Sequence, residues 1–155
     1  MAISVRIKLN LVALLACAYS LPTWAGCSDI FSGDFFILDW EGDEPKSASL
    51  SRYEKGSGFL SPNETYSLDY TGEKVTNSYG RTALKVAFKD HETLSHNYDY
   101  KLIINKKIEY KIYEITPTNK GIWGCPLASA KVNSCKAITN SGILFESKCG
   151  NLLND

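Results

Sequence analysis

The sequence predicts an all-β fold: a small antiparallel β-sandwich or barrel of about seven to nine strands, stapled by disulfides. Two observations carry this prediction. Apolar residues alternate with polar ones in many short segments, which is the period of a strand with one buried face. After residue 25, no segment shows a long apolar stripe with helical spacing. Asn, Asp, Gly and Pro cluster between the apolar segments, so we expect many short strands joined by turns.

Residues 1–25 have the composition of a cleaved export signal. Its parts are a basic start with Arg6 and Lys8, an apolar stretch over residues 9–19, and Ala25 as a small residue before Gly26. The apolar stretch is shorter than the roughly 18 residues that a stable membrane-spanning helix needs. We therefore expect cleavage between Ala25 and Gly26. The mature chain, residues 26–155, is then a single domain without a membrane span, located in the bacterial periplasm or secreted.

The residues around this position disfavour two alternatives to cleavage. An uncleaved membrane anchor requires a longer apolar stretch than the chain supplies. A lipoprotein would be acylated at Cys27, which follows Ala25 and Gly26 as in a lipid-attachment sequence. Trp24 occupies the position where such sequences usually carry Leu, so we expect no lipid anchor.

The charge of the mature chain disfavours one class of partner. Removing Arg6 and Lys8 leaves 15 basic residues against 17 acidic residues, a formal charge of −2. Nucleic-acid-binding proteins usually carry a basic excess on one face. The lysines of this chain are scattered among Asp and Glu along the sequence. We therefore expect no nucleic-acid partner.

Four cysteines remain after the signal: Cys27, Cys125, Cys135 and Cys149. An even number in an exported chain predicts two disulfides. We favour a local bridge from Cys125 to Cys135 and a bridge from Cys27 to Cys149 that ties the chain ends together. The alternative joins Cys27 to Cys125, and Cys135 to Cys149 across a C-terminal hairpin. A zinc site is disfavoured because the chain has no C-x-x-C pair.

The clearest local signal is a β-hairpin over residues 98–112. Two alternating apolar sets flank residues 105–107: Tyr98, Tyr100, Leu102 and Ile104 before them, and Ile108, Tyr110 and Ile112 after them. If both sets face one core, Leu102 lies opposite Tyr110, because a slip of one residue would turn one strand inside out. Tyr100 then lies opposite Ile112. The loop between the strands is three residues long.

Other segments also have the pattern of strands. The continuous apolar run from Phe35 to Trp40 predicts a strand buried on both faces or placed at the centre of a sheet. Alternation predicts two half-buried strands, one with Tyr66, Leu68 and Tyr70 and one with Leu84, Val86 and Phe88. Further strands are predicted at Ser47 to Tyr53, Val75 to Tyr79, Val132 to Ile138 and Gly142 to Ser147.

Both histidines of the chain lie in one short connection, between the strands that contain Phe88 and Tyr98. Asp90, His91, Glu92, His96 and Asp99 are the densest group of potential metal ligands or acid–base groups. Their spacing matches no known ligand motif. We interpret the connection as a solvated turn. A metal site or catalytic centre, if the chain has one, would use His91 and His96.

No other segment has the pattern of a catalytic site. A G-x-S-x-G sequence is absent, and residues 56–58 (Gly-Ser-Gly) are interpreted as a turn. The carboxylates of Asp39, Glu41, Asp43 and Glu44 are interpreted as parts of a charged surface loop. We therefore expect no catalytic residues and no cofactor.

The aromatic residues divide into a core set and a surface set. Five tyrosines share the phase of apolar neighbours and are predicted to lie in or beside the core: Tyr66, Tyr70, Tyr98, Tyr100 and Tyr110. Tyr53, Tyr79 and Tyr113 are less constrained and are predicted to contribute to a binding face. Trp40 and Trp123 are predicted to be packing residues whose indole N–H groups need partners.

These observations favour a non-enzymatic binding module, such as an inhibitor or an immunity-type protein, whose partner is another protein. The small size, the single domain and the missing catalytic motifs support this interpretation. Two alternatives remain: a small hydrolase or metal-dependent enzyme that uses the His91/His96 connection, and a subunit of a surface appendage that exchanges strands with its neighbours.

Overall fold

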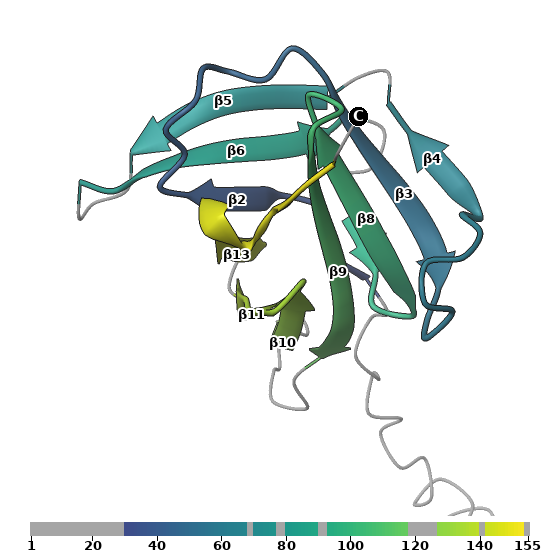
Figure 1. Cartoon of the computed structure of the whole chain (residues 1–155). Coiled ribbons are helices and arrows are strands. Elements are labelled where there is room, and N and C mark those ends of the chain that lie inside the picture. Colours follow the sequence, from purple (N-terminus) through teal and green to yellow (C-terminus); the bar gives the residue numbers. More distant parts are fainter. Residues whose placement is uncertain are drawn as a thin grey trace, which may run out of the picture.

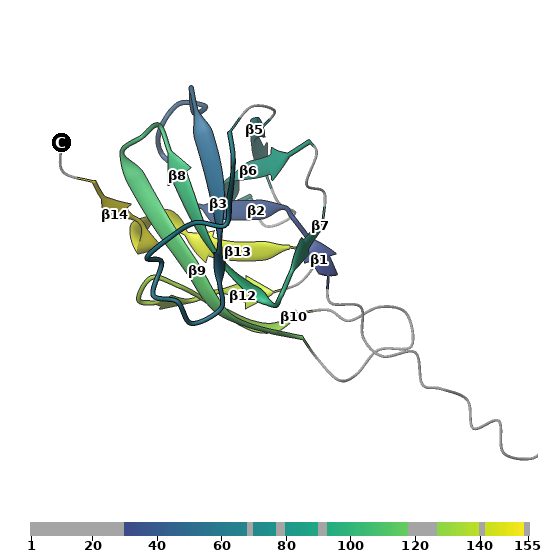
Figure 2. The same ribbon diagram turned by 90° about the vertical axis from the view of Figure 1, so that its right-hand side faces the viewer.

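The structure is a computed structural model of the 155-residue chain. It describes residues 30–67, 70–76, 80–89, 93–117, 127–139 and 142–153. These residues form fourteen strands, most of them in two larger sheets, and one short 3-10 helix, η2 (Ser147–Cys149), with no α-helix among them (Figures 1 and 2). The described part of the chain is therefore mostly β, as the sequence predicts. The predicted signal at residues 1–25 lies outside the described residues.

The largest sheet has the strand order β11-β10-β9-β8-β3-β4, and β14 lies beside β9. Every pair of neighbouring strands in this sheet is antiparallel. Its strands are β3 (Ala48–Glu54), β4 (Glu64–Tyr66), β8 (Tyr98–Ile104), β9 (Ile108–Pro117), β10 (Leu127–Val132), β11 (Cys135–Lys136) and β14 (Asn151–Leu152).

A second sheet has the order β12-β13-β2-β6-β5. Its strands are β2 (Phe35–Leu38), β5 (Tyr70–Thr76), β6 (Thr82–Phe88), β12 (Ile138–Thr139) and β13 (Ile143–Glu146). The pair β2–β13 is parallel, which departs from the predicted all-antiparallel arrangement. Two further strands, β1 (Ile30–Ser32) and β7 (Thr93–Ser95), form a separate two-stranded sheet.

The β8–β9 hairpin confirms the predicted register. Leu102 lies opposite Tyr110 and Tyr100 lies opposite Ile112, with a three-residue loop at residues 105–107. Asn105 begins this loop with a positive φ of 53°, a conformation that Asn tolerates better than most residues. Its side-chain oxygen also accepts hydrogen bonds from the backbone N–H groups at residues 46 and 47, at 2.7 and 3.2 Å. The loop is therefore tied to the start of β3.

Both larger sheets contribute side chains to one contiguous hydrophobic core. The strands of one sheet run steeply across those of the other (Figure 2). The strand at Phe35 is confirmed as central: β2 lies between β13 and β6, and Phe35 and Ile37 are fully buried. Trp40 is also buried, and its indole N–H donates to the carbonyl of Asp43 at 2.9 Å, as predicted. Trp123 lies outside the described residues.

The five tyrosines predicted to lie in or beside the core do so. Tyr100 and Tyr110 are among the largest fully buried side chains, and the other three, Tyr66, Tyr70 and Tyr98, pack against the core from partly buried positions. Burial raises the pKa of Tyr110 to about 12, because a phenolate in this apolar environment would lose its hydration.

Three predicted strands are wrong in extent. Tyr66 ends β4 in the largest sheet, whereas Tyr70 begins β5 in the second sheet, so the alternation of tyrosines spans a change of sheet. The strand predicted at residues 75–79 begins earlier, at Tyr70, and its described part ends at Thr76. The segment from Val132 to Ile138 is not one strand, because the chain turns at Asn133, which has a φ of 49°, and returns as β11.

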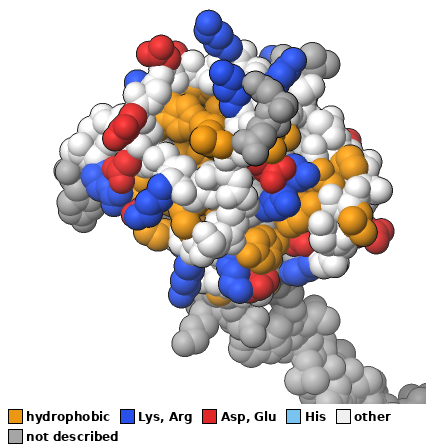
Figure 3. Space-filling model, in the orientation of Figure 1, with side chains coloured by type: hydrophobic (Ala, Val, Ile, Leu, Met, Phe, Trp, Pro, Cys, Tyr) orange, Lys and Arg blue, Asp and Glu red, His pale blue; other side chains and the backbone are white. Residues whose placement is uncertain are grey.

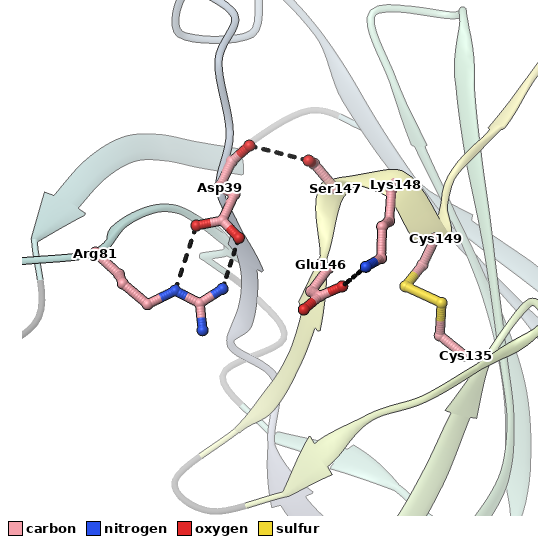
Figure 4. Close-up of polar contacts among 7 residues, drawn as sticks. All are labelled: Asp39, Arg81, Cys135, Glu146, Ser147, Lys148 and Cys149. Atoms are coloured by element: carbon pink, nitrogen blue, oxygen red, sulfur yellow. Dashed lines mark hydrogen bonds and ion pairs between the residues drawn. A yellow bond between two sulfur atoms is a disulfide. The ribbon is translucent and has the colours of Figure 1, made fainter. Parts of the chain in front are cut away.

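The favoured disulfide pairing is also wrong. Cys135 is bonded to Cys149, which excludes both the Cys125–Cys135 bridge and the Cys27–Cys149 bridge (Figure 4). The tight β10–β11 hairpin places Cys135 opposite the buried Val132, on the core side of the sheet, where it meets η2. Cys27 and Cys125 lie outside the described residues, so their pairing stays a prediction.

Candidate functional site

The connection that contains both histidines is only partly described. Asp90, His91 and Glu92 lie outside the described residues, and His96 lies in the turn between β7 and β8. The backbone carbonyl of His96 accepts a hydrogen bond from Lys55 Nζ at 3.0 Å. In the described ranges, no group of three or more His, Cys, Asp or Glu side chains is arranged to hold a metal ion.

Asp99, the remaining acidic residue of that group, has a different environment. It lies on β8 with 4 % of its surface exposed, and its Oδ2 accepts a hydrogen bond from the backbone N–H of Gly56 at 2.8 Å. The carboxylate thus fixes the connection that follows β3. This contact gives Asp99 a role in holding a loop.

The carboxylates after β2 lie on the surface. Glu41, Asp43 and Glu44 are exposed, as predicted for a charged loop. Asp39 accepts hydrogen bonds from Arg81 Nε at 3.3 Å and Nη2 at 2.6 Å, and these bonds hold the pKa of its carboxyl below the ordinary value of 3.8 (Figure 4). Asp39 is therefore held as a charged partner of Arg81.

Asp39 belongs to a cluster that we call the ion-pair cluster: Asp39, Arg81, Glu146, Ser147 and Lys148 (Figure 4). The Ser147 hydroxyl donates to the Asp39 carbonyl at 2.9 Å, and Lys148 Nζ lies 2.6 Å from Glu146 Oε2. Each charge in the cluster has an opposite charge beside it. The cluster links the end of β2, the segment before β6 and the end of β13.

The outer face of the largest sheet has a different charge arrangement. Leu102 and Tyr110 face the core, so their neighbours Lys101 and Lys111 face outward, and the register places these lysines directly opposite each other. Lys131 of β10 lies directly opposite Lys136 of β11 on the same outer face. Like charges in directly opposite positions destabilise a sheet. We call these four residues, Lys101, Lys111, Lys131 and Lys136, the lysine face.

Two glutamates compensate part of this charge. Glu109 lies between the first pair, with carboxylate oxygens 3.4 Å from Lys101 Nζ and 3.5 Å from Lys111 Nζ. Glu114 lies 2.8 Å from Lys131 Nζ and raises the pKa of that lysine by accepting its hydrogen bond. Lys136 is exposed and has no ion pair within the described ranges. Within the described ranges, two carboxylates therefore pair with three of the four lysines. On the side of the molecule shown in Figure 3, basic and acidic side chains are mixed.

Aromatic rings lie beneath the ammonium groups of the lysine face. The ring of Phe59 packs edge-on against Tyr53 and Tyr113, with centroid distances of 5.2 and 6.3 Å. Lys101 Nζ lies 5.2 Å from the Tyr53 centroid, and Lys111 Nζ lies 5.6 Å from the Phe59 centroid. Cation–π attraction at these distances helps to fix the lysine side chains.

The tyrosines predicted to form a binding face are only partly available. Tyr53 is buried, with 4 % of its surface exposed, because Phe59 covers it, so the prediction for this residue is wrong. Tyr113 is half-buried and donates its hydroxyl to the Asn133 carbonyl at 2.7 Å. Tyr79 lies outside the described residues.

Phe59 reaches the sheet from the β3–β4 loop, residues 55–63. Gly56 and Gly58 have φ values of 76° and 68°, and Phe59 itself has a φ of 62°. A bulky residue rarely adopts this left-handed conformation, and it persists only where the surroundings fix it. The turn predicted at residues 56–58 is thus confirmed. The next residue, Leu60, is 87 % exposed, the highest value among the exposed large apolar residues that the structure describes.

Hydrogen bonds hold both ends of the β3–β4 loop. Lys55 Nζ donates to the Ile115 carbonyl at 2.9 Å as well as to His96, and Gly56 donates to Asp99. At the other end, the backbone N–H of Asn63 donates to the Arg52 carbonyl at 2.7 Å. With Phe59 packed on the sheet, these contacts leave the apolar side chain of Leu60 displayed on an anchored loop.

A second polar group lies at the β4 edge of the same sheet. The guanidinium of Arg52 lies 4.4 Å from the Tyr98 ring centroid and 3.1 Å from Glu64, and the hydroxyl of Tyr66 donates to Glu64 at 2.6 Å. Burial is the largest cause of the raised pKa of Tyr66. These contacts join β4 to β3 and β8, and we assign them to sheet pairing.

Comparison of the chain with protein-family models, with curated proteins and with solved structures finds no match. No helix in the described part of the chain is both long and apolar enough to cross a membrane. The functional assignment rests on the surface of the chain itself, and above all on the residues around Leu60.

Proposed function

We propose that this chain is an exported, non-enzymatic protein-binding module of the inhibitor or immunity type. Its contact surface is the β3–β4 loop together with the lysine face. The observation that carries the proposal is Leu60, a large apolar side chain that is 87 % exposed on a loop held at both ends. We further propose that the two larger sheets form a sandwich or barrel, and that a second disulfide joins Cys27 to Cys125.

The anchored loop supports a binding role on energetic grounds. Ordering a flexible loop during association costs free energy, and a loop that is already fixed avoids that cost. Lys55, Gly56 and Phe59 are each held by contacts to the sheet or its turns. An apolar side chain presented in this way suits a pocket on a partner protein, because buried apolar anchors dominate the energy of many interfaces.

The burial of Tyr53 under Phe59 disfavours a nucleic-acid partner. Single-stranded nucleic acids stack their bases on exposed aromatic faces. Here Tyr53 is buried under Phe59, and Phe59 itself is covered in part by lysine ammonium groups. The rings hold the loop in place, and Tyr53 offers no open face for stacking.

The test compares two exposed apolar residues. Tagged mature protein and the variants Leu60→Ser and Ile138→Ser are used to capture partners from a periplasmic extract and a lysate of the source organism, and mass spectrometry identifies them. Ile138 is the matched control, because it is 60 % exposed but lies on β12 in the other sheet. We expect wild type and Ile138→Ser to retain the same protein in stoichiometric amount.

We expect Leu60→Ser to retain at least tenfold less of that protein, with an unchanged melting temperature. Equal retention by both variants, or the absence of any stoichiometric protein, would contradict the proposal.

A further inference from the structure

We propose that the lysine face recognises an acidic, extended segment of the protein partner, with closely spaced carboxylates of that segment contacting Lys111, Lys131 and Lys136. This inference rests on the proposed function and adds the chemistry of the partner. Leu60 supplies the apolar anchor, and the lysine face supplies the selection for charge.

The four lysines form a diagonal row across the sheet. They occupy four consecutive strands, β8, β9, β10 and β11. Neighbouring strands are separated by about 4.8 Å, so the row extends about 14 Å across the sheet. Lys131 lies opposite Tyr113, two residues beyond Lys111 on β9, which adds a step of about 7 Å along the strands.

This spacing fits an extended acidic peptide. In an extended chain, alternate side chains point to the same side and recur about every 7 Å. Two or three acidic residues at alternate positions therefore cover the distance from Lys111 to Lys136. Each carboxylate would lie close to one or two ammonium groups.

The positions of the lysines favour a binding function over a role in stabilising the sheet. A pair of like charges directly opposite each other weakens a sheet, and this face contains two such pairs. Exposed positions of a sheet accept many residue types, so an arrangement that opposes stability is expected where function requires it. A carboxylate of the partner offsets the repulsion between the lysines. The resulting electrostatic stabilisation is present only in the complex.

The available side chains are also partly ordered in advance. Glu114 and the Tyr113 ring hold the ammonium group of Lys131, whose side chain remains 51 % exposed. Lys111 is 38 % exposed, whereas Lys101, whose ammonium group lies against the rings of Tyr53 and Phe59, is only 18 % exposed. Lys111, Lys131 and Lys136 are therefore the residues that a partner reaches, and Lys101 acts through Glu109.

Other polyanions share this chemistry, but the rest of the molecule disfavours them. The mature chain has a formal charge of −2, so its surface outside the lysine face carries an acidic excess. A long polyanion would meet that excess beyond the row, whereas a short acidic segment of a protein would not.

The test uses a defined probe. The probe is a 12-residue peptide of alternating Glu and Ser with an uncharged dye, and its binding is followed by fluorescence anisotropy in about 50 mM salt, where exposed charges are weakly screened. The test variant is Lys131→Gln with Lys136→Gln. The matched control is Lys74→Gln with Lys89→Gln, which removes the same charge from exposed positions on and beside the second sheet.

We expect the test variant to bind the probe at least tenfold more weakly than wild type, and the control variant to stay within twofold. The inference that the lysine face binds an acidic segment would be overturned if wild type did not bind the probe, or if both variants lost affinity equally. Heparin and a twelve-residue oligothymidine are tested in parallel. If either one bound more tightly than the acidic peptide and lost this binding in the same test variant, the lysine face would be assigned to another polyanion. The inference of an acidic protein segment would then be overturned.

The probe also separates this inference from the proposed function. Leu60→Ser should leave probe binding unchanged although it abolishes capture of the partner. Probe binding through the lysine row without a captured partner would overturn the proposed function alone. A partner captured through Leu60 and retained equally by the Lys131/Lys136 variant would overturn the present inference alone.

Discussion

The lysine face and the ion-pair cluster are two charged surfaces of the same molecule with opposite designs. In the ion-pair cluster, two basic and two acidic side chains form two ion pairs, and each lies within hydrogen-bonding distance of an opposite charge (Figure 4). In the lysine face, Glu109 and Glu114 pair with three of the four basic side chains. The charges of the ion-pair cluster are balanced within the protein. The charges of the lysine face are balanced only when a partner supplies further negative charge.

This difference distinguishes charged side chains that hold the fold together from charged side chains that are available to bind a partner. A balanced group at the meeting point of several segments, such as Asp39 with Arg81, joins parts of the fold. In the lysine face, like charges lie opposite each other across the strands, and the carboxylates of Glu109 and Glu114 offset only part of their repulsion. Three predictions test this distinction.

The largest effect concerns what holds the segment that carries the ion-pair cluster. Exposed ion pairs contribute little to stability, so the Cys135–Cys149 disulfide should be the main constraint on η2. The bond closes a loop with a sequence separation of 14. We expect Cys135→Ala with Cys149→Ala to lower the free energy of unfolding by about 2–4 kcal/mol in urea denaturation. Equal urea midpoints for the variant and wild type would show that the ion pairs hold η2 without the disulfide.

The second effect concerns the lysine face without its central carboxylate. Glu109 is 9 % exposed, and Glu109→Gln leaves Lys101 and Lys111 opposite each other without a shared counter-charge. We expect the free energy of unfolding to fall by about 2 kcal/mol, less than for a fully buried pair because both lysines are partly solvated. Chemical denaturation measures the change.

Two further variants serve as controls for this prediction. Lys111→Gln introduced beside Glu109→Gln should recover at least half of the loss, because it removes the repulsion. Glu146→Gln, the matched change in the ion-pair cluster, should produce no measurable change. A loss that Lys111→Gln does not recover would indicate a packing effect and would contradict the electrostatic explanation.

The smallest effect is the pH dependence of the ion-pair cluster. Hydrogen bonds from Arg81 lower the pKa of Asp39 from the ordinary value of 3.8, so the folded state binds this proton less tightly than the unfolded state. The stabilisation is therefore fully present above the ordinary pKa and is lost as the pH falls through the lowered pKa. We expect the small difference in melting temperature between wild type and Asp39→Asn to vanish as the pH is lowered below about 4. A difference that is constant from pH 7 to pH 3 would contradict this assignment.

Much of the fold is predictable from the sequence where local pattern and geometry agree. The β8–β9 hairpin is predicted to the residue, because two alternating segments and a three-residue loop permit one register with both apolar sets in the core. The central position of β2 follows from its continuous apolar run. The exact extents of β4, β5 and β11 do not follow, because an alternating pattern continues through a change of sheet or a tight turn.

The candidate site is predictable only in part. The opposition of Lys101 and Lys111 follows from the predicted hairpin register, and this was the one signal for the lysine face in the sequence. The second pair, Lys131 and Lys136, depends on the turn at Asn133, a residue that the sequence pattern predicts to lie inside a strand. The covering of Tyr53 by Phe59 depends on a left-handed backbone conformation at Phe59, which no pattern in that segment predicts.

The parallel pairing of β2 with β13 has a consequence for the order of events during folding. β2 is one of the first strands of the described chain, yet one of its two partners begins at Ile143, more than a hundred residues later. The centre of the second sheet can be completed only after β13 (Ile143–Glu146) has been synthesised. Contacts of such long sequence separation slow folding. The β8–β9 hairpin, which needs only neighbouring residues, is therefore expected to form first, and the closing of β13 onto β2 is expected to be the last and slowest step.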